Sequence, residues 1–138
     1  MHRDDGSTLP LVAGLLALVL GAACAIIDLS SLYLERSRLA HIAESAARVG
    51  AESFDITGVT VSSTDTVITL EPDDVRSAAA EYLAEIAPVG VSLESATTSD
   101  GHTAAVTVSS SWVPPVAVPF MPSTMVVTVS GSARIQTR

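Results

Sequence analysis

Residues 9–27 read LPLVAGLLALVLGAACAII, a stretch of 19 residues without a charged side chain. Sixteen of the 19 are apolar, and the other three are Pro10, Gly14 and Gly21. At a rise of about 1.5 Å per residue, a helix of this length matches a hydrocarbon core roughly 30 Å thick. The stretch therefore predicts a transmembrane helix, and it concentrates the hydrophobicity behind the mean hydropathy of +0.46.

Two other uses of this apolar stretch are open. A cleaved secretory signal has a shorter apolar core of roughly 7–15 residues and a basic leader, whereas Arg3 here stands beside Asp4 and Asp5. A lipoprotein anchor at Cys24 would follow the small residues 21–23, but no large aliphatic residue stands three positions before the cysteine. Both departures favour a transmembrane helix, with Cys24 as a small packing residue.

The predicted membrane orientation depends on how much of the chain lies on each side of the span, and not on the charges beside it. Arg3 precedes the span while Arg36 and Arg38 follow it, so the positive-inside rule does not favour a cytoplasmic N-terminus. More than 100 residues rich in Ser, Thr and β-branched side chains follow the span, which is typical of an exported domain. We therefore predict a single-pass protein with a cytoplasmic leader (1–8), a transmembrane helix (9–27), an amphipathic helical stalk (28–53) and an extracytoplasmic head (54–138).

The helical pattern continues past the span. No proline occurs from Asp28 to Ala51, and apolar residues recur there at three- and four-residue steps. The predicted apolar face consists of Leu29, Leu32, Tyr33, Leu39, Ile42, Ala43, Ala46 and Val49. The pattern predicts one helix from about residue 9 to 51, of which half is embedded and half projects from the membrane.

The rest of the chain has the pattern of a small α+β head. Alternating apolar residues predict strands, and Pro72 followed by Asp73 and Asp74 is typical of a helix start. The expected elements are a hairpin (56–70), a helix (72–86), and three strands (89–95, 106–112 and 125–135), with a turn at 99–101. The predicted fold class is α+β: a long N-terminal transmembrane and stalk helix, then a small antiparallel sheet with one further helix. We expect the stalk helix, the second helix, or both to cover one face of the sheet.

Composition and missing motifs exclude several classes of function. Fifteen acidic residues against seven arginines and no lysine give a net charge of −8, which does not suit nucleic-acid binding. A single cysteine excludes internal disulfides and a Cys-based zinc site. The sequence has no nucleophile elbow and no glycine-rich phosphate loop. We therefore expect no enzymatic activity, no cofactor, no metal and no small-molecule substrate.

Two short clusters have an ordinary structural explanation. His41 and Glu44 lie one helical turn apart, a spacing that can share a metal, but no second pair joins them. A solvated helix face is therefore the favoured interpretation. Asp100 and His102 are residue types of a hydrolase triad, yet a tight turn explains both.

Asp28 and the loop 112–122 are candidates for contacts with other molecules. Asp28 directly follows the apolar run. The favoured interpretation is a polar residue at the membrane interface, and the other is a charge to which a partner protein docks. The loop contains four prolines and two large apolar residues, Phe120 and Met121, which are costly to leave in water. They either fold over the open sheet face or meet another protein.

A short leader ends in Gly6, an uncharged span begins at Ser7, and Ile27-Asp28, Tyr33 and Arg36 lead into an Ala-rich helix. This order resembles the N-terminal region of TadE/TadG-like proteins of the tight-adherence (Flp) pilus system. Ile27-Asp28 stands where that family often has Val-Asp, and Glu44 where it often has an Asp among alanines. The resemblance covers residues 4–51 best.

The resemblance implies a pilin-like minor subunit or pseudopilin that takes part in assembly of a Tad/Flp-type pilus or a related secretion apparatus. A prepilin-type peptidase would cut between Gly6 and Ser7, although this chain has Leu11 where pilins usually carry Glu. Implied partners are membrane lipid, other pilin-like subunits and pilus-assembly proteins. The candidate partner contacts are Asp28, Tyr33, Arg36, Trp112, Phe120 and Met121. The alternative is a membrane-anchored extracytoplasmic binding or sensing domain unrelated to pili.

Overall fold

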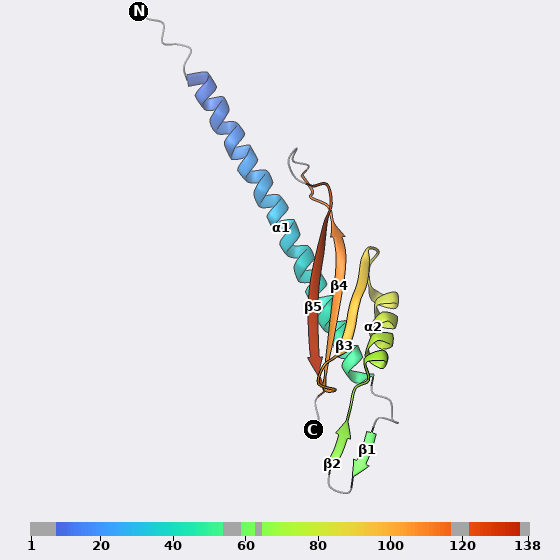
Figure 1. Cartoon of the computed structure of the whole chain (residues 1–138). Coiled ribbons are helices and arrows are strands. Elements are labelled where there is room, and N and C mark those ends of the chain that lie inside the picture. Colours follow the sequence, from blue (N-terminus) through green and yellow to red (C-terminus); the bar gives the residue numbers. More distant parts are fainter. Residues whose placement is uncertain (1–7, 54–58, 63–64, 117–121, 136–138) are drawn as a thin grey trace, which may run out of the picture.

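The computed structural model describes residues 8–53, 59–62, 65–116 and 122–135. Its first element is helix α1 (Thr8–Glu52), which runs for 45 residues without a break (Figure 1). Pro10 is tolerated because it lies in the first turn, where the backbone amides have no intrahelical acceptor. The prediction of one continuous helix through span and stalk is confirmed.

Helix α1 has an uncovered half and a docked half. The first half contains an 18-residue window of mean hydropathy 2.5, none of which is buried, and it stands clear of the other elements in Figure 1. The second half lies against the head. Its buried residues are Asp28, Leu39, Ala43, Ala46, Ala47, Gly50 and Ala51. The uncovered half is long and apolar enough to cross a membrane and fits a single-pass anchor.

Three antiparallel strands form the sheet of the head, in the order β3 (Val91–Thr98), β4 (Thr103–Trp112) and β5 (Met125–Arg134). Val91 pairs with Ser110, and Trp112 pairs with Met125. On β4 the predicted apolar positions Val106 and Val108 are fully buried. The predicted α+β fold with an antiparallel sheet is confirmed.

One part of the predicted strand pattern is wrong. Alternation was expected to run unbroken from Val89 through Ser95, but β3 begins at Val91 and carries a bulge. Leu93 pairs with Val108 and Ser95 pairs with Thr107, so Glu94 has no opposite residue. The extra residue reverses the alternation, because two residues on one strand then face one on the other. Ala96 is therefore buried while Ser95 is exposed.

The remaining elements connect α1 to the sheet. Strands β1 (Val59–Ser62) and β2 (Asp65–Ile68) form the predicted hairpin, which is a separate two-stranded sheet. Helix α2 (Pro72–Ile86) starts at the predicted proline and has two acidic residues in its first turn, where they complement the helix dipole. The predicted helix boundaries are confirmed.

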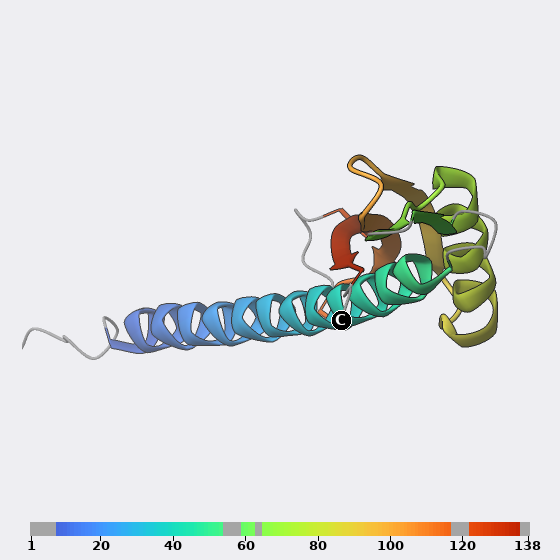
Figure 2. The same ribbon diagram turned by 90° about the horizontal axis from the view of Figure 1, so that it is seen from below.

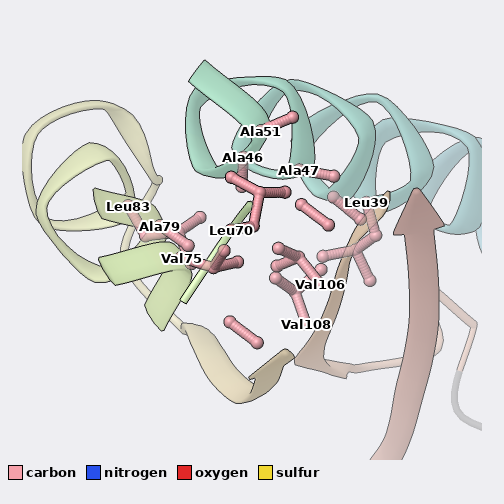
Figure 3. Close-up of a cluster of buried hydrophobic side chains, with 13 residues drawn as sticks. Leu39, Ala46, Ala47, Ala51, Leu70, Val75, Ala79, Leu83, Val106 and Val108 are labelled. Carbon is pink, nitrogen blue, oxygen red and sulfur yellow. The ribbon is translucent and has the colours of Figure 1, made fainter. Parts of the chain in front are cut away.

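Both helices cover the same face of the sheet. α1 lies against β4 and β5, α2 lies against β3, and the two helices also contact each other (Figures 1 and 2). Their apolar side chains meet those of β4 and Leu70 in one core, shown in Figure 3. The core members labelled there are Leu39, Ala46, Ala47, Ala51, Leu70, Val75, Ala79, Leu83, Val106 and Val108. The many alanines keep the layers close together, which explains a core with so few aromatic residues.

Helix and sheet approach each other closely at Gly131 of β5. A Cβ atom built there would lie 2.7 Å from the Ala43 carbonyl oxygen, and closer still to the carbonyl carbon of Ala43 and the amide nitrogen of Glu44. Only a residue without a side chain allows the backbones to pack this tightly.

The predicted apolar face of the stalk needs one correction. Leu29 and Tyr33 were expected to share the buried face, but both are exposed, and Asp28 is buried instead. The helix turns by about 100° per residue, so the face that continues to Leu39 and Ala43 passes through Asp28, Ser31 and Glu35. Polar residues therefore occupy the packed face at the top of the stalk.

The turn between β3 and β4 gives the head an acid-sensitive feature. The Asp100 carboxylate accepts hydrogen bonds from the amides of His102 (2.9 Å) and Thr103 (2.6 Å) and from the Thr103 hydroxyl (2.8 Å). These bonds lower the pKa of Asp100 to about 2, with the His102 amide as the largest cause. Gly101 follows at a φ of +68°, so the predicted turn is confirmed.

Acidification should remove the stabilisation that Asp100 provides. Because its folded pKa is below the unfolded value of 3.8, the contribution is complete above that pH and disappears as the pH falls towards 2. The difference in unfolding free energy between the wild-type chain and Asp100→Asn should shrink across this window, as measured by urea titrations. Asn keeps an acceptor for the two amides but cannot ionise, so a pH-independent difference would contradict the prediction.

Candidate functional site

Three polar side chains on one face of α1 meet the end of β4 and the loop after it. Asp28, Ser31 and Glu35 lie three and four residues apart, so they project from the same side of the helix. We call this the junction cluster, formed by Asp28, Ser31 and Glu35 with Ser110, Trp112 and Val116. It lies where the uncovered half of α1 becomes the docked half.

Each α1 residue of the junction cluster accepts one hydrogen bond from the head. The Trp112 indole nitrogen donates to the Ser31 hydroxyl (3.1 Å), and the Ser110 hydroxyl donates to the Glu35 carboxylate (3.2 Å). The amide of Val116 donates to Asp28 Oδ1 (3.0 Å). These bonds join residues more than 70 positions apart in sequence, so they fix the angle at which the head leaves the helix.

Asp28 is the most buried charged residue of the junction cluster, with 4% of its surface exposed. Its second oxygen, Oδ2, is buried and has no hydrogen-bond partner among the described residues. Burying a carboxylate with incomplete hydrogen bonding is costly, so this residue is not explained by stability alone. It directly follows the last residue of the apolar stretch 9–27, which places a buried charge where the docked half of α1 begins.

The opposite side of α1 at this level is exposed. Tyr33 and Arg36 are both open to solvent, as are Leu29 and Leu34. Arg38 lies 3.9 Å from the Glu35 carboxylate, but the pair is partly exposed and contributes little to stability. This exposed side of the helix is therefore an apolar surface that ends at Arg36.

The structure brings together only some of the predicted contact residues. Asp28 and Trp112 belong to the junction cluster, and both are buried by the chain's own head. Tyr33 and Arg36 lie on the exposed side of α1. The remaining candidates, Gly6, Ser7, Phe120 and Met121, lie outside the described residues. Whether any of the six contact candidates meets a partner stays a prediction.

Sequence reasoning missed Ser31, Glu35 and Ser110. The usable signal was that Asp28, Ser31 and Glu35 follow helical spacing on the same face as Leu39. Their partners on β4 could not be found in this way because the long-range pairing sets which strand end lies beside them.

The other clusters considered in the sequence lie apart from the junction. His41 and Glu44 are exposed on α1, and the described ranges contain no group of three or more potential metal ligands. A shallow hollow at the far end of α1 is lined by Arg48, Glu52, Arg134 and neighbouring residues. Its charges are mixed, so it does not select one kind of ligand.

The similarity to a known protein family lies in the segment that contains α1. Residues 6–53 match a family described as putative Flp pilus-assembly TadE/G-like, which confirms the resemblance seen in the sequence. The matched segment covers α1 (Thr8–Glu52) from end to end and leaves the head outside the match. No curated protein and no solved structure matches the chain. The family supports a part in pilus assembly and interaction with other pilus components.

Proposed function

We propose that this chain, with its TadE/G-like residues 6–53, is a minor pilin or pseudopilin that helps to assemble a Tad/Flp-type pilus or a related secretion apparatus. One observation carries this role. Within the family-matched segment, residues 8–52 form a single helix whose first half is uncovered and apolar and whose second half bears a compact head. A subunit held by its helix and presenting its head to partners needs this division.

The uncovered half of α1 supports the mechanism. In the membrane, lipid covers the apolar side chains of residues 8–27, and in an assembly the helices of other subunits would replace the lipid. Gly14 and Gly21 lie two turns apart, and nothing lies within 4 Å of the position where either would carry a Cβ. Small residues at this spacing let a neighbouring helix approach closely.

The head would supply contacts to pilus components outside the cytoplasm. Its role is structural in this proposal, and the exposed side of α1 at Tyr33 and Arg36 lies next to the uncovered half. A neighbouring subunit that packs along the span and continues along α1 would meet these two residues. A membrane-anchored sensing domain is the alternative function, and the family match of α1 weighs against it.

The mature N-terminus and the location of the chain test the proposed role. Filaments sheared from piliated cells should contain the chain at a small fraction of the major subunit, and mass spectrometry should give Ser7 as its first residue. Gly6→Leu should keep the leader and remove the chain from filaments, whereas Ser7→Ala, the neighbouring control, should change neither. A chain that keeps Met1 and stays in the membrane fraction would contradict a pilin-like subunit.

A further inference from the structure

Exposed apolar side chains outside α1 gather at one end of the head. Within the described part of the chain, five large apolar residues outside α1 are exposed, and Val89 is fully so. Val126 and Val113 expose 73% and 63% of their surfaces. We call this group the apolar foot: Ile86, Val89, Val113, Met125 and Val126. Single exposed apolar residues are ordinary, but five at one end of a small domain are not.

The topology explains why these residues share one end. Helix α2 ends, β3 begins, β4 ends and β5 begins there, as the pairs Val91–Ser110 and Trp112–Met125 show. The junction cluster joins the same end to α1 through Ser31 and Asp28. In Figure 1 this is the end of the head that faces the uncovered half of α1.

The two chain segments that form the apolar foot carry no charged residue. The sequence carries no charged residue from 86 to 93 or from 103 to 133, although the chain as a whole has a net charge of −8. All of the apolar foot falls within these two uncharged stretches. The opposite end of the head carries Glu71, Asp73, Asp74, Asp100 and Arg134, all in exposed or half-exposed positions. Toward the apolar foot the flanking charges are the exposed Glu85 and Glu94, so the charges of the head become fewer at this end but do not disappear.

The level of the apolar foot matches the end of the span. Residues 8–27 form a helix of roughly 30 Å, which is the thickness of the hydrocarbon core. Asp28 and Ser31 come immediately after this stretch and accept hydrogen bonds from Val116 and Trp112. The segment 112–116, which includes Val113 of the apolar foot, therefore lies where hydrocarbon gives way to headgroups. The exposed Leu29 and Tyr33 on α1 lie at the same level, and tyrosine is enriched at this depth.

We propose that the apolar foot rests on the membrane that α1 crosses, with its side chains in the boundary between headgroups and acyl chains. The chain would then bind the bilayer at two places, through the helix and through the foot. Contact at both places limits tilting of the head about the junction. This placement depends on the proposed membrane anchor, and the occupant of the surface is lipid rather than a second protein.

Spin labels on the full-length chain test this contact. In a Cys24→Ser background, single cysteines at Val89 and Val113 would carry a nitroxide, with the chain in vesicles of phosphatidylcholine and phosphatidylglycerol. Collision with oxygen, which is enriched in lipid, is compared with collision with a water-soluble nickel complex. Leu16→Cys reports the span, and Ser99→Cys is the matched control in an exposed turn at the opposite end of the head.

The expected result is a severalfold higher oxygen-to-nickel ratio at Val89 and Val113 than at Ser99, in the direction of the ratio at Leu16. Water-like values at both foot positions with a lipid-like value at Leu16 would overturn the foot and leave the anchor standing. Protection from both reagents, with spin–spin broadening that is lost on dilution with unlabelled chain, would assign the surface to a second copy. A water-like value at Leu16 would overturn the anchor and the foot together.

Discussion

Replacing Gly131 with alanine is expected to destabilise the head by about 3 kcal/mol or more. The added Cβ would meet backbone atoms of Ala43 and Glu44 on α1 rather than the end of a flexible side chain. Neither backbone can move without disturbing the helix or the antiparallel pairing of Gly131 with Val106. The cost should appear in urea titrations of the full chain in detergent micelles, followed by far-UV circular dichroism.

Gly21→Ala is the matched control, because the same methyl group is added at a glycine with nothing within 4 Å. Alanine is the better helix former, so this variant should leave the head as stable as the wild type. Equal stability of Gly131→Ala and the control would contradict the close approach of β5 to α1. The contrast tests the docking of the head separately from the intrinsic preferences of helix and strand.

Replacing Trp112 with alanine is the second large change, with an expected loss of about 3–5 kcal/mol. Trp112 is the one tryptophan of the chain, it is buried, and its indole nitrogen donates to Ser31. The substitution removes a buried ring and the hydrogen bond that joins β4 to α1. Urea titration of the full chain in micelles, followed by circular dichroism, would measure the loss.

Trp112→Phe separates the ring from the hydrogen bond. Phenylalanine keeps most of the apolar contact and loses only the donor, so the cost should be closer to 1 kcal/mol. The outcome also bears on the sequence-based expectation that Trp112 contacts a partner. If Trp112→Ala leaves the head as stable as the wild type and impairs pilus assembly, Trp112 belongs to a partner interface rather than to the junction cluster.

The long helix and the order of the elements could be predicted because each depends on local chemistry. An uncharged apolar run predicts the span, the absence of proline from Asp28 to Ala51 predicts its continuation, and Pro72 with two acids predicts the start of α2. The strands follow from alternation, except where the bulge at Glu94 changes the face of the residues after it. A bulge depends on the partner strand, so the alternation of β3 alone cannot reveal it.

The candidate site could be predicted only in part. Asp28 was interpreted as a polar residue at the membrane interface or as a docking charge, and Trp112 as part of a contact loop, so neither was expected to be buried by the chain's own fold. In the structure both are buried where α1 meets the end of β4. Because α1 and β4 run antiparallel, Trp112 lies beside Ser31. Helical spacing identifies which residues share a face, and it does not identify which face the sheet covers.

The sequence by itself therefore determined the apolar stretch that fits a membrane anchor, the α+β class, the Asp100 turn and the resemblance to a pilus-assembly family. These depend on hydrophobic length, periodicity and turn residues within short segments. The tertiary structure alone decided that β5 packs against the backbone of α1 at Gly131, that Asp28 is buried, and that the exposed apolar residues of the head lie at the end facing the uncovered half of α1. Each of these is a relation between segments distant in the chain, and such relations arise only when the sheet docks on the helix.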